Sequence, residues 1–162
     1  MATNNLLQRL PMKDDITFAD VAESNRRQVE TFLSGALNAG VIDKGDIVAF
    51  DTSKTGPERV IYVNVAPLQA NGNGLACGVA ITATTGSEQR VDVIVAGYAA
   101  NVNCHGALVA ANRITAAGTS AGTADGRIAA DIAPAFAVAL EASRATADGY
   151  TNPTACWIYK QF

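Results

Sequence analysis

The chain of 162 residues has few charged side chains, which make up 17% of the sequence and are concentrated in its first 60 residues. It contains 12 Lys and Arg and 15 Asp and Glu, so the net charge is −3. Proteins that bind nucleic acid need clustered Lys or Arg to neutralise phosphates. The only adjacent basic residues, Arg26 and Arg27, are flanked by Glu23 and Glu30. We therefore expect no direct nucleic-acid partner, and we expect the low-charge surface of the later residues to serve self-association.

Long apolar runs are missing as well. No stretch of about 18 apolar residues could cross a bilayer as a helix, and the start of the chain lacks the charged and then apolar layout of a signal peptide. We therefore expect no membrane association, and we expect the protein to be made and kept in a cytoplasm. Cys77, Cys104 and Cys156 are odd in number and far apart, so we expect buried thiols rather than a disulfide framework.

The residues of a catalytic or metal site are scarce. His105 is the only histidine, and it follows Cys104, whose side chain would point to the opposite face of an extended strand. Residues 43–46 fit a turn rather than a calcium loop, and residues 71–74 lack the Lys-Ser/Thr of a phosphate-binding loop. No ligand set with metal-site spacing occurs. We therefore expect no catalytic residues, no metal, no cofactor and no enzymatic activity.

Two segments precede the part of the chain that has a β pattern. Residues 1–16 carry apolar side chains without a lasting period and contain Pro11, which predicts an extended N-terminal arm. Residues 17–40 predict one α-helix, because Thr17 and Asp20 resemble a capping box and Gly40 suits the C-terminal end. The apolar positions with helical spacing are Val29, Phe32, Leu33, Ala36 and Leu37.

Residues 45–162 predict a mainly β body in which about seven short strands form a small barrel or a sandwich-like domain. The expected strands are residues 47–50, 60–65, 77–82, 91–96, 108–114, 136–140 and 156–159. Turn residues separate the strands, and Asp125 with Gly126 is the strongest two-residue hairpin signal. Alanine is frequent where Val, Ile and Thr are usual. Strands of small residues bury little area each, which favours further burial between subunits.

The end of the chain concentrates aromatic side chains. On an extended strand Trp157 and Tyr159 share one face, and Ile158 and Lys160 share the other. We expect the aromatic face to be buried. The sequence leaves open whether it is buried in the chain's own core or against a neighbour.

The stretch from Gly97 to Ala142 is a series of short Ala-, Gly- and Thr-rich segments. It includes G-A-L-V-A-A-N-R-I-T at residues 106–115 and V-A-L-E-A at residues 138–142. With the last strand, this pattern resembles the head decoration (cement) proteins of tailed bacteriophages over residues 45–162. The resemblance implies a non-enzymatic virion protein on the exterior of the capsid. It also implies a homotrimer that clamps neighbouring subunits of the major capsid protein.

The resemblance further implies a role for the N-terminal arm, since such proteins often add an arm strand to an exposed edge of the capsid protein. The expected capsid-binding residues are the hydrophobic anchors Leu6, Leu7, Leu10 and Met12. The arm and the helix of residues 17–40 are additions that a minimal decoration protein does not need.

Two other functions remain open at this point. A glycan- or receptor-binding β-domain of a phage tail or fibre would need exposed aromatic side chains on a strand face. The candidates for that role are Tyr98, Tyr150, Trp157 and Tyr159. A hydrolase with an unfamiliar site could use Cys104 and His105 or isolated carboxylates, and it has the least support.

Overall fold

The computed structural model describes residues 27–66, 75–105, 108–111, 113–116, 122–126, 135–146 and 149–159. These residues are mainly β, with a closed five-stranded barrel and additional strands, which confirms the β-barrel expected for the body. The strands are β1 (Arg27–Ser34), β2 (Val41–Ile42), β3 (Ile47–Phe50), β4 (Tyr62–Val65), β5 (Ala76–Ala80), β6 (Thr84–Thr85), β7 (Arg90–Val102), β8 (Arg113–Ala116), β9 (Ala124–Gly126), β10 (Ala137–Ala139) and β11 (Thr154–Ile158). Within the described residues the helical elements are the 3-10 helices η3 (Leu37–Gly40) and η4 (Gly56–Val60), and no helix there is long and apolar enough to cross a membrane.

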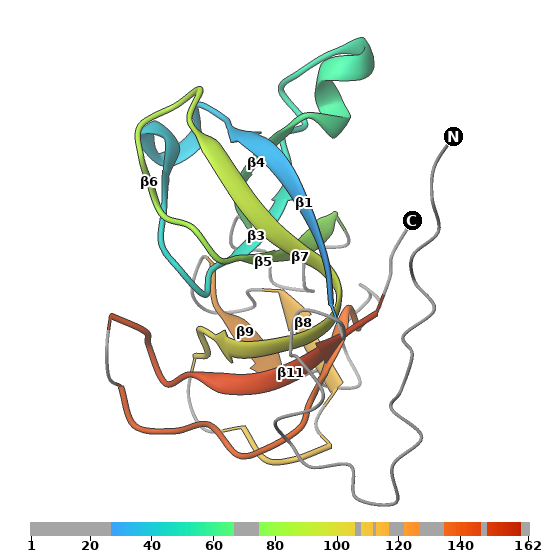
Figure 1. The fold of residues 1–162 in the computed structure, drawn as a ribbon, viewed down its shortest axis with the longest axis vertical. Helices are drawn as coiled ribbons and strands as arrows, with labels where there is room; N and C mark the ends of the chain where they lie inside the picture. The colour runs from blue at the N-terminus through green and yellow to red at the C-terminus, as the bar shows by residue number, and fades with distance from the viewer. Residues whose placement is uncertain are drawn as a thin grey trace, which may run out of the picture.

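Five strands close the barrel in the order β1-β4-β3-β5-β7, and β7 pairs back with β1 (Figure 1). β1 and β4 run parallel, with Leu33 opposite Tyr62, whereas the other neighbours in the barrel are antiparallel. The strands are rich in β-branched residues and alanine, which suits a pleated surface packed on a core. Closure gives each barrel strand a partner on both sides, so the backbone donors and acceptors of the wall bind one another.

β7 continues beyond the barrel and begins a second layer. Its first part pairs with β1 and β5, and its last residues pair with β11, from Gly97 opposite Ile158 to Val102 opposite Thr154. The layer continues through β10 and β8 to β9, and all of its pairs are antiparallel. Figure 1 shows this layer below the barrel, with β11 in red. β7 therefore connects the two parts of the molecule through one continuous strand.

Two groups of buried apolar side chains hold these parts together. The barrel core contains Phe32, Ile42, Val48, Val63, Val65, Cys77, Ala80, Val91, Val93 and Val95. The layer core, between the barrel wall and the second layer, contains Ile47, Ala49, Ala66, Ala76, Val79, Ile94, Ala99, Val102, Cys104, Leu108, Ile114, Phe136, Ala137, Ala139, Cys156 and Ile158. β3 and β5 contribute to both cores, because successive side chains of a strand point to opposite faces. These strands are therefore buried on both faces, and their sequences are nearly continuous apolar runs.

The expected α-helix over residues 17–40 is wrong for the part that the structure describes. Arg27–Ser34 form β1, and η3 follows it. The helical spacing is a coincidence here, because Phe32 enters the barrel core whereas Val29 is 41% exposed. Pairing with β7 along the whole of β1 satisfies its backbone and outweighs a weak helical preference. Residues 1–26, which include the arm and the start of the expected helix, lie outside the described residues.

Other boundaries within the body also differ from expectation. Asp125 and Gly126 do not form a hairpin turn but lie in β9, where Gly126 is opposite Ile114 of β8. The strand expected over residues 108–114 begins only at Arg113. β2 and β6 were not expected, because two residues carry no measurable period. The turn predicted at residues 71–74 lies outside the described residues.

Candidate interaction surface

The outer surface of the second layer carries a row of side chains centred on β11. Trp157 is in register with Tyr98 of β7 on one side and with Val138 of β10 on the other. Val138 is in register with Arg113 of β8, so the row crosses four strands. Side chains that are directly opposite on neighbouring strands lie close enough to contact one another. We call the apolar part of this row, Tyr98, Val138 and Trp157, the Trp157 face.

Trp157 is the exposed centre of this face, whereas Tyr98 and Val138 on either side of it are half-buried. Trp157 is 42% exposed, although hydrogen-bonded strands flank β11 on both sides. Tyr159 (39%) and Leu140 (47%) extend the apolar exposure at the ends of β11 and β10. Their backbone N–H groups donate to Phe136 O and Ala155 O, each at 2.8 Å. Large apolar side chains displayed on a rigid sheet are typical of a binding surface.

A polar border lies beside this face, near the end of β7. Arg144 forms an ion pair with Glu141 (Nε to Oε1, 3.2 Å) and donates from Nη2 to Ala100 O at 2.9 Å and to Asn101 Oδ1 at 2.7 Å. Glu141 Oε1 also accepts a hydrogen bond from the N–H of Ala155 at 3.1 Å. Opposite charges are therefore paired at the border. An apolar centre with a polar rim is the usual anatomy of a protein interface.

The sequence left open whether the aromatic face of the last strand is buried in the chain's own core or against a neighbour, and the structure excludes the chain's own core for Trp157 and Tyr159. Cys156 and Ile158 are 0% and 1% exposed and enter the layer core, whereas Trp157 between them points outward. Successive side chains of β11 point to opposite faces as predicted, but the aromatic side chains are on the outer face. Cys156 lies opposite Ala99, and Ile158 lies opposite Ala137, so the layer core at β11 is narrow and accepts side chains smaller than tryptophan.

The buried thiols are not arranged for nucleophilic chemistry. Cys104 is buried and His105 is exposed, just after the end of β7 at Val102. Burial raises the pKa of Cys77 to about 12. Burial also raises the pKa of Cys156, and the nearby Cys104 adds to the rise. A thiol that stays protonated at neutral pH is a poor nucleophile. Across the described parts of the chain, no group of three or more His, Cys, Asp or Glu side chains could hold a metal ion.

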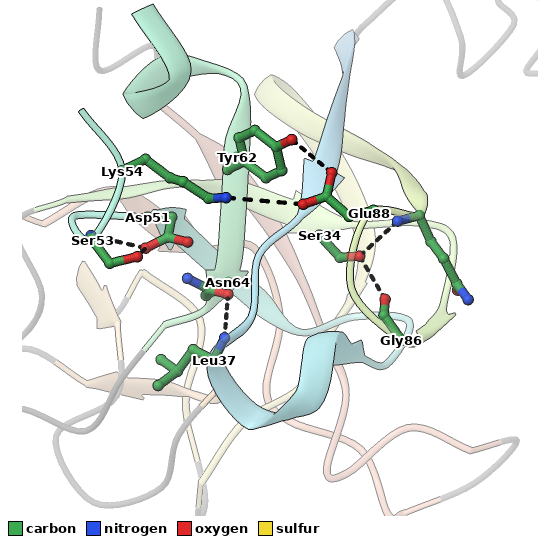
Figure 2. A network of polar contacts seen from close by, with 10 residues as sticks. Ser34, Leu37, Asp51, Ser53, Lys54, Tyr62, Asn64, Gly86 and Glu88 are labelled. Carbon is green, nitrogen blue, oxygen red and sulfur yellow. Dashed lines mark hydrogen bonds and ion pairs between the residues drawn. The ribbon is translucent and has the colours of Figure 1, made fainter. Parts of the chain in front are cut away.

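Polar side chains gather around Asp51 at one end of the barrel (Figure 2). Asp51 Oδ1 accepts hydrogen bonds from the N–H (2.9 Å) and the hydroxyl (2.6 Å) of Ser53. Asn64 Oδ1 accepts one from the N–H of Leu37 at 3.2 Å. Gly35 lies so close that a Cβ there would collide with the side chains of Asn64 and Asp51. Burial raises the pKa of the Asp51 carboxyl, but the hydrogen bonds from Ser53 and Asn64 outweigh it and hold the pKa below its ordinary value.

A second group of contacts completes this end of the barrel. Lys54 Nζ lies 3.9 Å from Glu88 Oε1 and 4.0 Å from the centroid of the Tyr62 ring. The Tyr62 hydroxyl donates to Glu88 Oε2 at 2.6 Å, and this bond raises the pKa of Tyr62. The Ser34 hydroxyl donates to Gly86 O at 2.7 Å. The polar groups in Figure 2 therefore bind one another, and we interpret the cluster as closing the barrel end rather than as a ligand site.

A third polar group joins the barrel to the second layer. Asp46, just before β3, accepts hydrogen bonds from the side-chain amide of Asn103 (2.8 Å) and from the N–H of Asp43 (3.1 Å), within the turn predicted at residues 43–46. Asn103, just after β7, also donates to Lys44 O at 3.1 Å and accepts from the N–H of Thr151 at 2.9 Å. Burial raises the pKa of Asp46 to about 6, although these hydrogen bonds oppose it. Asp46 therefore changes charge near neutral pH.

The remaining candidates from the sequence do not extend the Trp157 face. The capsid-binding residues expected in the arm, Leu6, Leu7, Leu10 and Met12, lie outside the described residues. Tyr150 is half-buried at the turn that contains Gly45, where a Cβ would come within 2.7 Å of its ring. Sequence reasoning missed Val138 and Arg113, although the alternation of the strand at residues 136–140 could have found Val138.

No family model matches the chain, and no curated protein matches it either. The fold and the surface define a class: a closed five-stranded β-barrel that carries a second antiparallel layer with the exposed Trp157 on its outer face.

Proposed function

We propose that this chain is a capsid decoration protein of a bacteriophage. It is a non-enzymatic virion protein that binds the outer surface of the capsid as a homotrimer and stabilises contacts between subunits of the major capsid protein. The Trp157 face supports this proposal most, because it is a rigid, exposed apolar surface on a body with few charges. Protein interfaces are enriched in Trp, Tyr and Arg and depleted in Lys, Asp and Glu.

The physical role of such a protein is to add contact area between capsid subunits. The Trp157 face supplies an apolar patch, and the arm supplies the anchors Leu6, Leu7, Leu10 and Met12, which would accompany a strand added to the capsid protein. Once one copy of a trimer is bound to the capsid, the other two copies are held near their own binding sites at a high effective concentration. Weak contacts of each copy would therefore give a long-lived attachment of the trimer. No catalytic group is needed for this role.

The proposal is tested by the solution mass of the full-length protein and by its sedimentation with undecorated capsids of the phage that encodes it. We expect light scattering to give three times the mass of the chain, and we expect the protein to pellet with the capsids. Bovine serum albumin at the same concentration is the control for trapping in the pellet. A monomer that stays in the supernatant at every capsid concentration would contradict the proposal.

A glycan- or receptor-binding domain of a phage tail or fibre is the second candidate. The register of Trp157 with Tyr98 favours it, because neighbouring aromatic rings on a flat strand face can stack on a sugar. Glycan-array binding that Trp157→Ala removes, without any sedimentation with capsids, would establish this second function in place of the first.

A further inference from the structure

The Trp157 face is an exposed apolar surface next to the point where the described chain begins. Arg27, the first residue of β1, is opposite Gly97 of β7, and Gly97 is opposite Ile158 of β11. Arg27 is therefore two strand spacings, about 10 Å, from β11. Figure 1 shows the start of β1 beside the layer that contains β11.

The direction of β1 leads the preceding chain towards this face. β1 runs antiparallel to β7, so the direction from Ser34 back to Arg27 points along β7 past Gly97 towards Tyr98. Tyr98 is the residue that is in register with Trp157. The described chain therefore begins at the edge of the Trp157 face, and 26 residues precede it in the sequence.

The length and composition of this N-terminal segment match the surface. Residues 6–12 hold Leu6, Leu7, Leu10 and Met12, and Arg9 is the one charged residue among them. Residues 13–26 connect them to β1 and can span about 45 Å when extended. The connection is therefore much longer than the distance that residues 6–12 must cover to lie on Trp157. An apolar segment that covers an exposed apolar surface removes apolar area of both from water, which is favourable.

We propose that residues 6–12 of the chain's own N-terminal segment dock on the Trp157 face in the free protein. The arm and the face then shield each other from non-specific association, and the capsid protein competes for both when the protein binds. This inference goes beyond the capsid role, because it concerns the protein in the absence of any capsid.

The single tryptophan of the chain makes the contact directly measurable, because all tryptophan fluorescence comes from Trp157. The test uses the full-length chain and the triple variant Leu6→Asp, Leu7→Asp, Leu10→Asp. The matched control, Asn4→Asp, Asn5→Asp, Gln8→Glu, adds the same three negative charges to the same segment without removing an apolar side chain. Far-UV circular dichroism checks that all three proteins have the same secondary structure.

We expect acrylamide to quench the triple variant about twofold more strongly than the wild type and the control, because the exposed part of the ring loses its cover. The emission maximum of the triple variant should move to longer wavelength. Equal quenching of the three proteins would overturn the inference. Protection that disappears on dilution would also overturn it, because the arm of a second copy would then be the occupant. The assay contains no capsid, so a protein that pellets with capsids but shows no arm-dependent protection keeps the proposed function and loses only this inference.

Discussion

The barrel core and the layer core are built from different side chains. The barrel core consists mainly of branched and aromatic residues, with Ala80 as its one alanine. Among the described residues, the layer core contains six alanines in a group of 16, namely Ala49, Ala66, Ala76, Ala99, Ala137 and Ala139. Alanine lets backbones approach closely but buries little apolar area. We infer that the second layer depends on a few large residues, and that it displays its tryptophan outward because the narrow core leaves no room for it.

The two cores can be compared by removing one phenylalanine from each. Phe136 is 2% exposed in the layer core, and Phe32 is 5% exposed in the barrel core, where it packs edge-on against the half-buried Phe50. We expect Phe136→Ala to lower the free energy of unfolding by about 4 to 5 kcal/mol and Phe32→Ala by about 3 kcal/mol. The alanines of the layer core have side chains too short to fill the cavity left by Phe136→Ala, whereas Phe50, which packs on Phe32, is large enough to fill part of the cavity left there. Urea denaturation measures both values, and the opposite order would refute the proposed difference between the cores.

The connection between barrel and layer should depend on pH through Asp46. Its pKa is raised from 3.8 to about 6 in the folded protein, so its contribution to stability is full below pH 3.8 and is lost as the pH rises through 6. We expect the wild type to lose about 2 kcal/mol of unfolding free energy relative to Asp46→Asn as the pH rises from 4.5 to 7.5. Every other titratable group is present in both proteins, so the difference isolates the contribution of Asp46. A difference that does not change with pH would show that Asp46 is not the buried titrating group.

Asp51, at the opposite end of β3, should behave in the opposite way. Its pKa is lowered, so its contribution is present above the ordinary value of 3.8 and is lost as the pH falls through the lowered pKa. Asp51→Asn places an amide beside Asn64, so we expect a loss of about 1 to 2 kcal/mol at neutral pH. Ser53→Ala is the milder control, because it removes one of the two donors to Asp51 Oδ1. Urea denaturation at pH 3 and 7 measures the effect, and an Asp51→Asn protein as stable as the wild type at pH 7 would contradict it.

The outward face of the layer should contribute least to stability. Trp157 is 42% exposed, and its cross-strand neighbours among the described residues are Tyr98 and Val138. We expect Trp157→Ala to cost about 1 kcal/mol, compared with the 3 to 5 kcal/mol that is typical of a buried tryptophan. Thermal denaturation of the variant is the measurement. A loss near 4 kcal/mol would mean that the ring is buried in the protein's own structure.

The sequence was sufficient to predict the strands of the body whose alternation or β-branched residues are visible locally. β3, β4, β5, β7, β10 and β11 overlap the expected ranges. β1 was assigned to a helix, because its pairing with β7 is a long-range property that a local apolar spacing does not contain. β2, β6 and β9 are too short to show a period.

The candidate surface could be predicted only in part. The alternation of the last strand placed Trp157 and Tyr159 together, but both faces of that strand are apolar in sequence, so the inward side could not be chosen from it. The choice depends on the alanines of β7 and β10 that line the layer core beside Cys156 and Ile158. Asp46 and Asn103 were not linked by any motif, since they meet only when the end of β7 packs on the turn before β3.

The most direct test of the proposed function is sedimentation of the full-length Trp157→Ala variant with undecorated capsids. Val60→Ala is its matched control, because Val60 is 62% exposed in η4 of the barrel and not on the Trp157 face. If the Trp157 face binds the capsid, Trp157→Ala should shift the capsid concentration for half-maximal binding at least about tenfold upward, equivalent to about 1.4 kcal/mol, while Val60→Ala binds as the wild type does. Equal binding of both variants and the wild type would contradict the assignment of the Trp157 face as the capsid-binding surface.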